Sequence, residues 1–408
     1  MTETFVIIGA GQAAGQVAAT LRTKGFAGRI VLIGEEAYVP YERPPLSKAF
    51  LAGELPVEKT FLKKPEYYEE KAIELRLGRR VVALDRTART VNLDDGETIA
   101  YDKALIATGA RVRNLMAPGS ELEGIHYLRT IADVDGIRAD LKPGSRVAIV
   151  GAGYIGLEVA AVVRKLGHEV TVVEALDRVM ARVVAPEVSH FYERVHTAAG
   201  VGLRLNTGLT AFEGDGRFER LRLTDGSAVD GALAVVGIGV VPNVELAAES
   251  GLEVNDGIVV DEYGRTSDPH VFAAGDVTNH PNAILGRNIR LESVQNAMSQ
   301  GKAAALAMLG ELEAYAEVPW FWSDQYDLKL QIAGLWAADD EIVIRGDMDA
   351  QKFSVIYLRD GAMAAINVVN NMRDFLPAKR LIAGGYKLDP RRLADPDVTL
   401  KELLKEHV

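Results

Sequence analysis

The sequence predicts an α/β fold that contains two dinucleotide-binding domains and a small C-terminal α+β domain. Three observations lead to this fold. A glycine-rich turn joins an apolar segment to a helical pattern near residue 9, and the same arrangement recurs near residue 151. From Pro319 onward, short alternating segments replace this pattern. Each glycine-rich unit is typical of a Rossmann-like fold, in which a strand, a tight turn and a helix hold a pyrophosphate.

The first unit begins with a short apolar run that we expect to be a strand. Gly9 permits the tight turn, Gly11 lets the backbone approach a pyrophosphate, and Ala14 lets the next helix pack closely on the strand. The N-terminus of that helix would then direct free N–H groups at the phosphates. A second strand at residues 29–33 leads to Glu35, whose carboxylate suits a ribose diol. Its spacing from the first glycine is slightly longer than the usual distance of about 20 residues.

Two consecutive prolines, Pro44 and Pro45, follow the second strand. Proline restricts both its own backbone and that of the preceding residue, so we expect no helix to begin before Ser47. This restriction places Lys48 at a defined point of the chain. Considered alone, however, this turn favours an ordinary solvated lysine.

Short strands with polar turns are expected between residues 75 and 102, with a hairpin at residues 91–96. An apolar strand then ends at Thr108 and Gly109. The first part of the N-terminal domain is expected to end here.

The second glycine-rich unit is more complete than the first. Residues 147–150 are expected to form a strand, and residues 151–156 are a full Gly-x-Gly-x-x-Gly motif. A helix is expected at residues 157–166, and Gly167 closes it. A chance recurrence of all these features is improbable, so the sequence predicts two bound dinucleotides.

The strand after this motif ends at Glu174, near the expected distance from the first glycine. A carboxylate here accepts hydrogen bonds from a ribose 2′-hydroxyl but repels a 2′-phosphate, which favours NADH over NADPH. Arg178 is an alternative determinant, because a nearby guanidinium would reverse that preference.

The remaining candidate elements follow the second unit. An apolar strand ends at Gly239, and residues 266–276 are expected to form a strand that ends at Gly275 and Asp276. A helix N-cap is an equally open interpretation of this aspartate. The C-terminal domain opens on Trp320 in an aromatic cluster, which is either core or a lid over a planar ligand.

Composition excludes several classes of protein. The 408 residues carry a net charge of −11, which disfavours nucleic acid as a partner. The chain has no cysteine, which excludes disulfides, thiolate metal sites and dithiol relays, and we predict no metal site. The longest apolar stretch, residues 232–242, is too short to cross a bilayer. Because Glu3 leads at once into a strand, unlike a secretory signal, we expect a cytoplasmic protein.

Taken together, these motifs resemble those of the two-dinucleotide-fold flavoprotein reductases related to glutathione reductase. The motifs that carry the resemblance are Gly9-Ala10-Gly11, Arg43-Pro44-Pro45-Leu46-Ser47-Lys48, Ala107-Thr108-Gly109, residues 151–158 and Ala274-Gly275-Asp276. Residues 290–297 and 319–326 further resemble the ferredoxin reductases of the putidaredoxin reductase and biphenyl dioxygenase reductase type. This resemblance extends over essentially the whole chain.

The resemblance implies FAD in the N-terminal site and NADH in the central one. The FAD-binding domain would then be discontinuous, with parts at 1–110 and 241–317 around an NAD-binding domain at 111–240, and the C-terminal domain at 318–408. The residues implied to bind FAD are Gly9, Gly11, Ala13, Ala14, Glu35, Arg43, Lys48, Val81, Thr108, Gly109, Arg129, Gly275, Asp276, Val294 and Trp320. Those implied to bind NAD are Gly151, Gly153, Tyr154, Ile155, Gly156, Glu158, Glu174 and Gly239.

Three of these residues are implied to take part in catalysis. Lys48 and Glu158 would form an ion pair near the flavin N5 atom, and Trp320 would lie near the isoalloxazine ring. Asp276 would hold the ribityl and phosphate region of the flavin. Relatives that use a dithiol carry a cysteine pair beside the flavin, and this chain cannot, so electrons must leave by another route.

The implied function is transfer of a hydride from NADH to FAD and of single electrons to a [2Fe-2S] ferredoxin that serves a cytochrome P450 or ring-hydroxylating oxygenase. A reductase of rubredoxin or of a small-molecule acceptor is the alternative. A flavin-bearing protein similar to the apoptosis-inducing flavoprotein is a further alternative, which the acidic composition disfavours. A local basic excess predicts that the ferredoxin docks near Lys379 and Arg380, with Arg290 as an extension. The sequence leaves the oligomeric state open.

Overall fold

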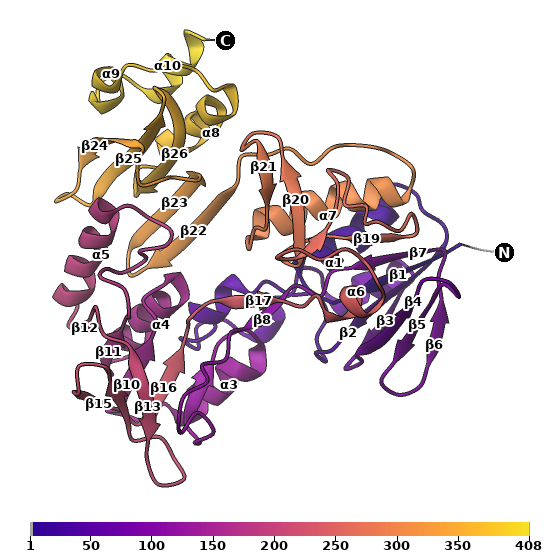
Figure 1. The fold of residues 1–408 in the computed structure, drawn as a ribbon, viewed down its shortest axis with the longest axis horizontal. Helices are drawn as coiled ribbons and strands as arrows, with labels where there is room; N and C mark the ends of the chain where they lie inside the picture. The colour runs from indigo at the N-terminus through magenta and orange to yellow at the C-terminus, as the bar shows by residue number, and fades with distance from the viewer. Residues whose placement is uncertain (1–2, 408) are drawn as a thin grey trace. The chain divides into compact units, whose positions relative to one another are not determined.

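The computed structural model describes residues 3–407, and the chain divides into two compact units (Figure 1). The first unit contains the chain up to Glu42 together with residues 57–111 and 241–319. The second unit contains residues 43–56, residues 112–240 and the chain from Trp320 onward. Neither unit is therefore a continuous stretch of sequence. The predicted domain limits stay a prediction, and their outermost residues, 1–2 and 408, lie outside the described part of the chain.

A parallel sheet with the strand order β19-β7-β1-β2-β3 forms the centre of the first unit. Its strands are β1 (Thr4–Ile8), β2 (Arg29–Gly34), β3 (Ile73–Leu77), β7 (Lys103–Ile106) and β19 (Val271–Ala273). Alternate residues of β1 enter two different hydrophobic cores, with Phe5 in one and Val6 in the other. Both faces of the sheet are buried, which explains why its strands are continuous apolar runs.

Helices cover one face of this sheet and a small antiparallel sheet covers the other (Figure 1). The helices α1 (Gln12–Thr23) and α7 (Val294–Met308) pack against each other. The antiparallel sheet contains β4 (Val81–Asp85), β5 (Thr90–Leu93) and β6 (Thr98–Ala100). Its β5–β6 turn confirms the hairpin predicted at residues 91–96. The unit also contains η2 (Val57–Lys59), α2 (Pro65–Glu70), α6 (Glu245–Glu249), β18 (Ile258–Val259), β20 (Thr278–Asn282) and β21 (Arg287–Ile289).

The second unit repeats the parallel arrangement with the strand order β12-β11-β10-β16-β9. Its strands are β9 (Ile125–Tyr127), β10 (Arg146–Val150), β11 (Glu169–Val173), β12 (Gly202–Arg204) and β16 (Leu233–Val236). Its helices are η1 (Pro44–Ser47), α3 (Ile131–Asp140), α4 (Tyr154–Lys165) and α5 (Pro186–Ala198). An antiparallel sheet joins β13 (Leu209–Glu213), β14 (Arg220–Leu223) and β15 (Ala228–Asp230). A separate pair, β8 (Ala110–Val112) and β17 (Val240–Pro242), lies where the chain passes from one unit to the other.

The C-terminal part of the second unit is an antiparallel sheet with the order β22-β23-β26-β25-β24. Its strands are β22 (Trp320–Gln325), β23 (Leu328–Gly334), β24 (Glu341–Asp347), β25 (Lys352–Arg359) and β26 (Ala362–Val369). Four helical segments follow the last strand, namely η3 (Met372–Asp374), α8 (Phe375–Gly384), α9 (Pro390–Ala394) and α10 (Leu400–Lys405) (Figure 1). The predicted fold class, two Rossmann-like domains and a C-terminal α+β domain, is confirmed.

Several local predictions were wrong. Pro44 and Pro45 open η1, because proline needs no N–H partner in the first helical turn. The strand predicted at residues 266–276 is confined to β19, and Asp276 is not a helix N-cap, because it lies between two strands. Within residues 3–407, no helix is long and apolar enough to cross a membrane.

Candidate functional site

The first glycine-rich turn has the geometry of a phosphate site. Gly9 has φ +115°, and a Cβ at this position would lie 2.2 Å from the carbonyl oxygen of Ala107. Gly11 is the extended N-cap of α1 and makes no side-chain capping bond. A Cβ on Gly11 would meet no atom within 4 Å, so open space lies before the unsatisfied N–H groups of α1. The turn therefore fits the pyrophosphate of FAD.

Other predicted FAD residues of the first unit lie at the ends of neighbouring elements. Glu35 is exposed directly after β2, and Val81 opens β4. Gly275 follows β19, where a Cβ would lie 3.1 Å from the Cβ of Ala13, and Asp276 comes next. The remaining members are Ala14 in α1, Thr108 and Gly109 after β7, and Val294 as the first residue of α7.

Gln300 on α7 supports this turn, although no sequence motif indicated it. Its Oε1 atom accepts hydrogen bonds of 2.8 Å from the backbone N–H of Gly275 and from the hydroxyl of Thr278. The side chain is 1% exposed, and its Nε2 atom is buried without a hydrogen-bond partner among the described residues. Gln300 thus stabilises the backbone turn that presents Asp276.

The second glycine-rich turn has the same construction, and two of its glycines leave no room for a Cβ. A Cβ on Gly151, at φ +103°, would lie 2.4 Å from the carbonyl oxygen of Gly237, and a Cβ on Gly156 would lie 2.1 Å from that of Gly151. Gly153 is the uncapped N-cap of α4, with open space where its Cβ would be. Ile155 is 40% exposed in the first turn of this helix. Gly239 lies beyond β16 at φ +104°.

Glu174 is attached to this second turn. One carboxylate oxygen accepts a hydrogen bond of 2.7 Å from the N–H of Ala152, and the other accepts one of 2.9 Å from the N–H of Leu176. Arg178 is engaged elsewhere, because it donates to the carbonyl oxygen of Val184 and to the hydroxyl of Ser189, both at 2.7 Å. The carboxylate of Glu174 therefore lies at the dinucleotide turn, whereas the guanidinium of Arg178 is held by hydrogen bonds to other residues.

A buried ion pair joins two of the predicted catalytic residues within the second unit. Lys48 Nζ lies 2.6 Å from an oxygen of Glu158, whose side chain is only 4% exposed. Ser47 donates a hydrogen bond of 2.5 Å to the same oxygen, and Ser323 donates one of 2.6 Å to the other. The carboxylate thus has three donors, which is what a buried anion requires.

Four further predicted residues belong to the second unit, namely Arg43, Arg129, Tyr154 and Trp320. Arg43 precedes η1 and donates to the carbonyl oxygen of Arg129. The ring of Tyr154 contacts that of Phe321 at 4.7 Å between centroids. Trp320 opens β22, and the ammonium of Lys379 lies 5.4 Å from its ring centroid.

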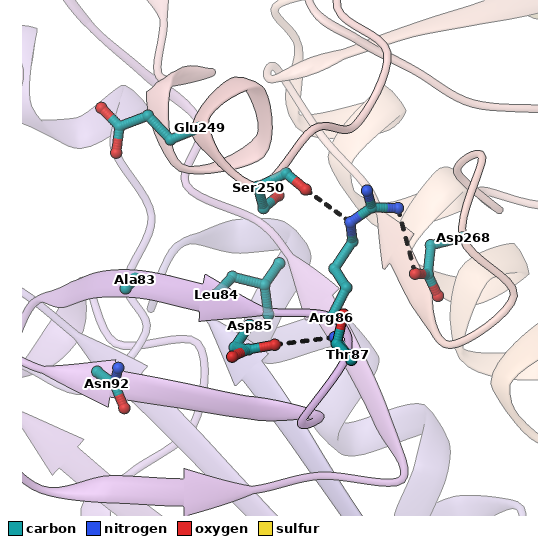
Figure 2. Close-up of a pocket in the computed structure, with 9 residues that line it drawn as sticks. All are labelled: Ala83, Leu84, Asp85, Arg86, Thr87, Asn92, Glu249, Ser250 and Asp268. Carbon is teal, nitrogen blue, oxygen red and sulfur yellow. Dashed lines mark hydrogen bonds and ion pairs between the residues drawn. The ribbon is translucent and has the colours of Figure 1, made fainter.

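A shallow polar hollow elsewhere in the first unit is not a comparable site (Figure 2). Its central arginine, Arg86, donates to the carbonyl oxygen of Ser250 at 2.6 Å and pairs with Asp268 at 3.4 Å. Arg86 is thus used to hold the end of α6 and the loop before β19 to the β4–β5 hairpin. Among residues 3–407, no group of three or more side chains is arranged to hold a metal ion.

Two dinucleotide turns and a buried lysine–glutamate pair define an oxidoreductase with two nucleotide cofactors. Comparison with known proteins agrees with this class. Residues 3–301 match the pyridine nucleotide-disulphide oxidoreductase family, and residues 320–404 match the reductase C-terminal family. The chain belongs to the pyridine nucleotide-disulphide oxidoreductase family, as predicted, and its cofactors are FAD and NADH.

Three similar proteins cover the chain almost completely. Rhodocoxin reductase of Rhodococcus erythropolis is 44% identical, and the match covers 99% of this chain and 95% of that protein. The ferredoxin–NAD(+) reductase component of the anthranilate 1,2-dioxygenase system of Burkholderia cepacia is 45% identical, with 98% and 99% covered. The crystal structure of the covalent putidaredoxin reductase–putidaredoxin complex superimposes with a TM-score of 0.96 at 38% identity, with 99% and 98% covered.

Proposed function

We propose that the chain takes a hydride from NADH and passes electrons singly to a [2Fe-2S] ferredoxin that serves a cytochrome P450 or a ring-hydroxylating oxygenase. The chain is a ferredoxin–NAD(+) reductase, the predicted enzyme class. The observation that carries this function is the pair of open, uncapped dinucleotide turns in a chain without cysteine. A full-length relative is named as the ferredoxin–NAD(+) reductase component of a dioxygenase system.

The residues of the chain bind and orient the two cofactors. The first turn, with Glu35 and Asp276, holds FAD, and the second turn, with Glu174, holds NADH. When bound, FAD would supply an acceptor for the hydride and a donor of single electrons. The ion pair of Lys48 and Glu158 would present no net charge to the reacting rings, and Trp320 would cover the flavin.

The experiment that tests this function is a stopped-flow trace of the purified FAD protein with NADH, followed by a panel of [2Fe-2S] ferredoxins, a rubredoxin and a small quinone. We expect rapid loss of the flavin absorbance and preferential reduction of a ferredoxin. Faster reduction of rubredoxin or the quinone than of every ferredoxin would support the alternative acceptor. Slow NADH oxidation would instead fit a flavin-bearing binding protein.

We expect NADH to be favoured over NADPH by at least about tenfold in kcat/KM, or about 1.4 kcal/mol. The reason is that a 2′-phosphate would face the carboxylate of Glu174, while Arg178 is bound to Val184 and Ser189. The Glu174→Gln variant keeps an acceptor for the Ala152 N–H but removes the charge, so its preference should be smaller. Equal values for the two nucleotides in the native protein would contradict this assignment.

We place the ferredoxin docking surface on η3 and α8 of the C-terminal domain. Arg373 and Arg380 are exposed there, beside Met372 and Leu376, which are 50% and 69% exposed. Exposed apolar side chains within a basic patch suit an acidic partner that must bind briefly and leave. Lys379, between them, also contacts the ring of Trp320.

Arg290 contributes less to this surface than the sequence suggested. Its guanidinium is paired with Asp256 at 3.2 Å and with Glu292, so its charge is offset within the first unit.

The base of the docking surface is rigid, because the carboxylate of Asp374, directly before α8, is buried and paired. It lies 3.1 Å from Arg345 and accepts hydrogen bonds from Ser354 and Asn371. We therefore centre the docking surface on Lys379 and Arg380.

Reversing the charges of Lys379 and Arg380 to Glu should raise the KM for ferredoxin about tenfold and leave flavin reduction by NADH intact. Native ferredoxin reduction should also fall steeply as salt passes 0.1 M, where the screening length is about 10 Å, whereas quinone reduction should hardly change. The control carries the same change of charge at the exposed Lys401 and Lys405 of α10. An unchanged KM in the Lys379/Arg380 variant would move the docking site elsewhere.

The proposal also includes the limits of the domains and the location of the protein in the cell. The FAD domain has parts at 1–110 and 241–317, the NAD domain spans 111–240, and the C-terminal domain spans 318–408. We also propose a cytoplasmic location, which the lack of any cysteine supports, because secreted proteins commonly depend on disulfides.

A further inference from the structure

Glu158 lies at the inner end of a chain of hydrogen bonds that extends away from Lys48. Ser323 Oγ is 2.6 Å from the carboxylate, and Gln325 Nε2 is 3.1 Å from Ser323 Oγ. Gln325 Oε1 is 2.8 Å from His196 Nε2, and the hydroxyl of Tyr326 is 3.2 Å from His196 Nδ1. Ser323, Gln325 and His196 are 0% exposed, so the bonds between them are shielded from bulk water, whereas Tyr326 is half-buried.

Secondary structure brings these residues together. Phe321, Ser323 and Gln325 alternate along β22 and therefore share one face of the strand. Tyr154 and Glu158 are one helical turn apart on α4, so they face β22 together, with Tyr154 against Phe321 and Glu158 against Ser323. His196 reaches the end of this row from α5.

The ionised carboxylate determines the direction of every bond in the chain. Glu158 can only accept, so Ser323 must donate its single hydroxyl hydrogen to it. The Gln325 atom that faces Ser323 must then be the amide nitrogen, which leaves the amide oxygen facing His196. That oxygen can only accept, so His196 carries its hydrogen on Nε2.

His196 completes the chain as a neutral ring. Burial lowers its pKa, so the imidazole has one hydrogen, and its Nδ1 atom accepts from the hydroxyl of Tyr326. Each donor thus points toward Glu158, and the bonds of such an aligned chain strengthen one another. An amide in the middle of the chain does not pass protons readily, so the arrangement orients a charge and does not conduct protons.

We propose that Ser323, Gln325 and His196 are positioning residues, which hold the carboxylate of Glu158 oriented toward Lys48 during hydride transfer. This inference rests on the role proposed above for the Lys48–Glu158 pair. It gives the C-terminal strand β22 a part in the NADH half-reaction, because two of the positioning residues belong to that strand.

The first arm of the test examines the chain itself by 15N NMR of the histidine rings in the FAD-loaded protein, with His196→Gln used for assignment. We expect a neutral His196 with its hydrogen on Nε2. In Gln325→Glu, the new carboxylate faces both His196 and Ser323, so we expect a His196 protonated on both nitrogens. A hydrogen on Nδ1 in the native protein would overturn the proposed direction of the chain.

The second arm measures flavin reduction by NADH in the stopped flow. Ser323→Ala and Gln325→Glu should each lower the limiting rate about tenfold, with the dissociation constant for NADH changed less than about twofold. Ser323→Thr, which restores a hydroxyl, should recover most of the rate. The matched control is Ser145→Ala, which removes the hydrogen bond of another buried serine, that to the carbonyl oxygen of Lys142.

The two arms separate the possible failures. If Ser323→Ala reacts as fast as Ser145→Ala while Glu158→Gln is slow, the positioning role is wrong and the proposed role of the ion pair stands. If Glu158→Gln itself is as fast as the native protein, the role of the ion pair is wrong, and the NMR arm still decides the direction of the chain.

Discussion

Replacing Lys48 with Met should slow the reduction of bound FAD by NADH about 100-fold and leave the FAD content unchanged. Methionine has a similar length but no charge, so the variant leaves Glu158 buried without its cation. Breaking a buried ion pair by removing one partner costs about 3–5 kcal/mol. We expect a smaller effect here, because Lys48 is 20% exposed and because Ser47 and Ser323 still donate to the carboxylate.

Stopped-flow spectroscopy at saturating NADH measures this effect, and Lys48→Arg, which keeps the charge, is the control. The double variant Lys48→Met/Glu158→Gln should be less impaired than the product of the two single effects, since the unpaired anion is then absent. Unchanged flavin reduction together with failed ferredoxin reduction would show that Lys48 acts in the second half-reaction.

Acidification should destabilise the protein through His280 by about 3 kcal/mol between pH 6.5 and pH 4. His280 on β20 is 1% exposed, its ring lies 5.1 Å from that of Tyr315, and neither ring nitrogen has a hydrogen-bond partner among residues 3–407. Burial lowers its pKa to about 4. The unfolded chain takes up a proton near pH 6.5 and the folded chain resists until about pH 4, so this stability is lost as the pH falls.

Denaturant unfolding of the FAD protein at several pH values from 7 to 4 measures this loss. Carboxylates also titrate in this range, so the comparison is between variants. His280→Phe should lose less stability on acidification than the native protein, whereas His190→Gln, a change at an exposed histidine, should lose the same amount. An identical pH dependence in His280→Phe and the native protein would contradict the assignment.

Local patterns predicted the two dinucleotide turns because their chemistry is contained in a few consecutive residues. Gly9 and Gly151 adopt positive φ values in turns that allow no Cβ, so only glycine fits these positions. The motif can therefore be recognised from one sequence. The segment at Pro44 was misjudged because proline is compatible with the first turn of a 3-10 helix. The wrong prediction therefore concerns only the local backbone geometry of this segment.

The ion pair and its supports depend on tertiary structure. Lys48 and Glu158 are 110 residues apart, and only the family resemblance suggested that they meet. Ser323 and Gln325 lie in β22 and Gln300 lies in α7, and no motif or spacing in the sequence distinguishes them from the other polar residues of these elements. Their importance follows from burial, because a buried polar group must find a partner that the sequence does not name.

The way the chain alternates between the two units has a consequence for synthesis on the ribosome. β1 begins at Thr4, but the last strand of its sheet, β19, is made much later. The helix that packs against α1 is α7, which ends at Met308. At roughly 5–20 residues per second, about 15–60 seconds separate the first strand from that helix. The turn that presents Asp276 is made in the same late interval. The nascent N-terminal segment therefore emerges long before FAD can bind it, and depletion of flavin during growth should reduce the yield of folded protein.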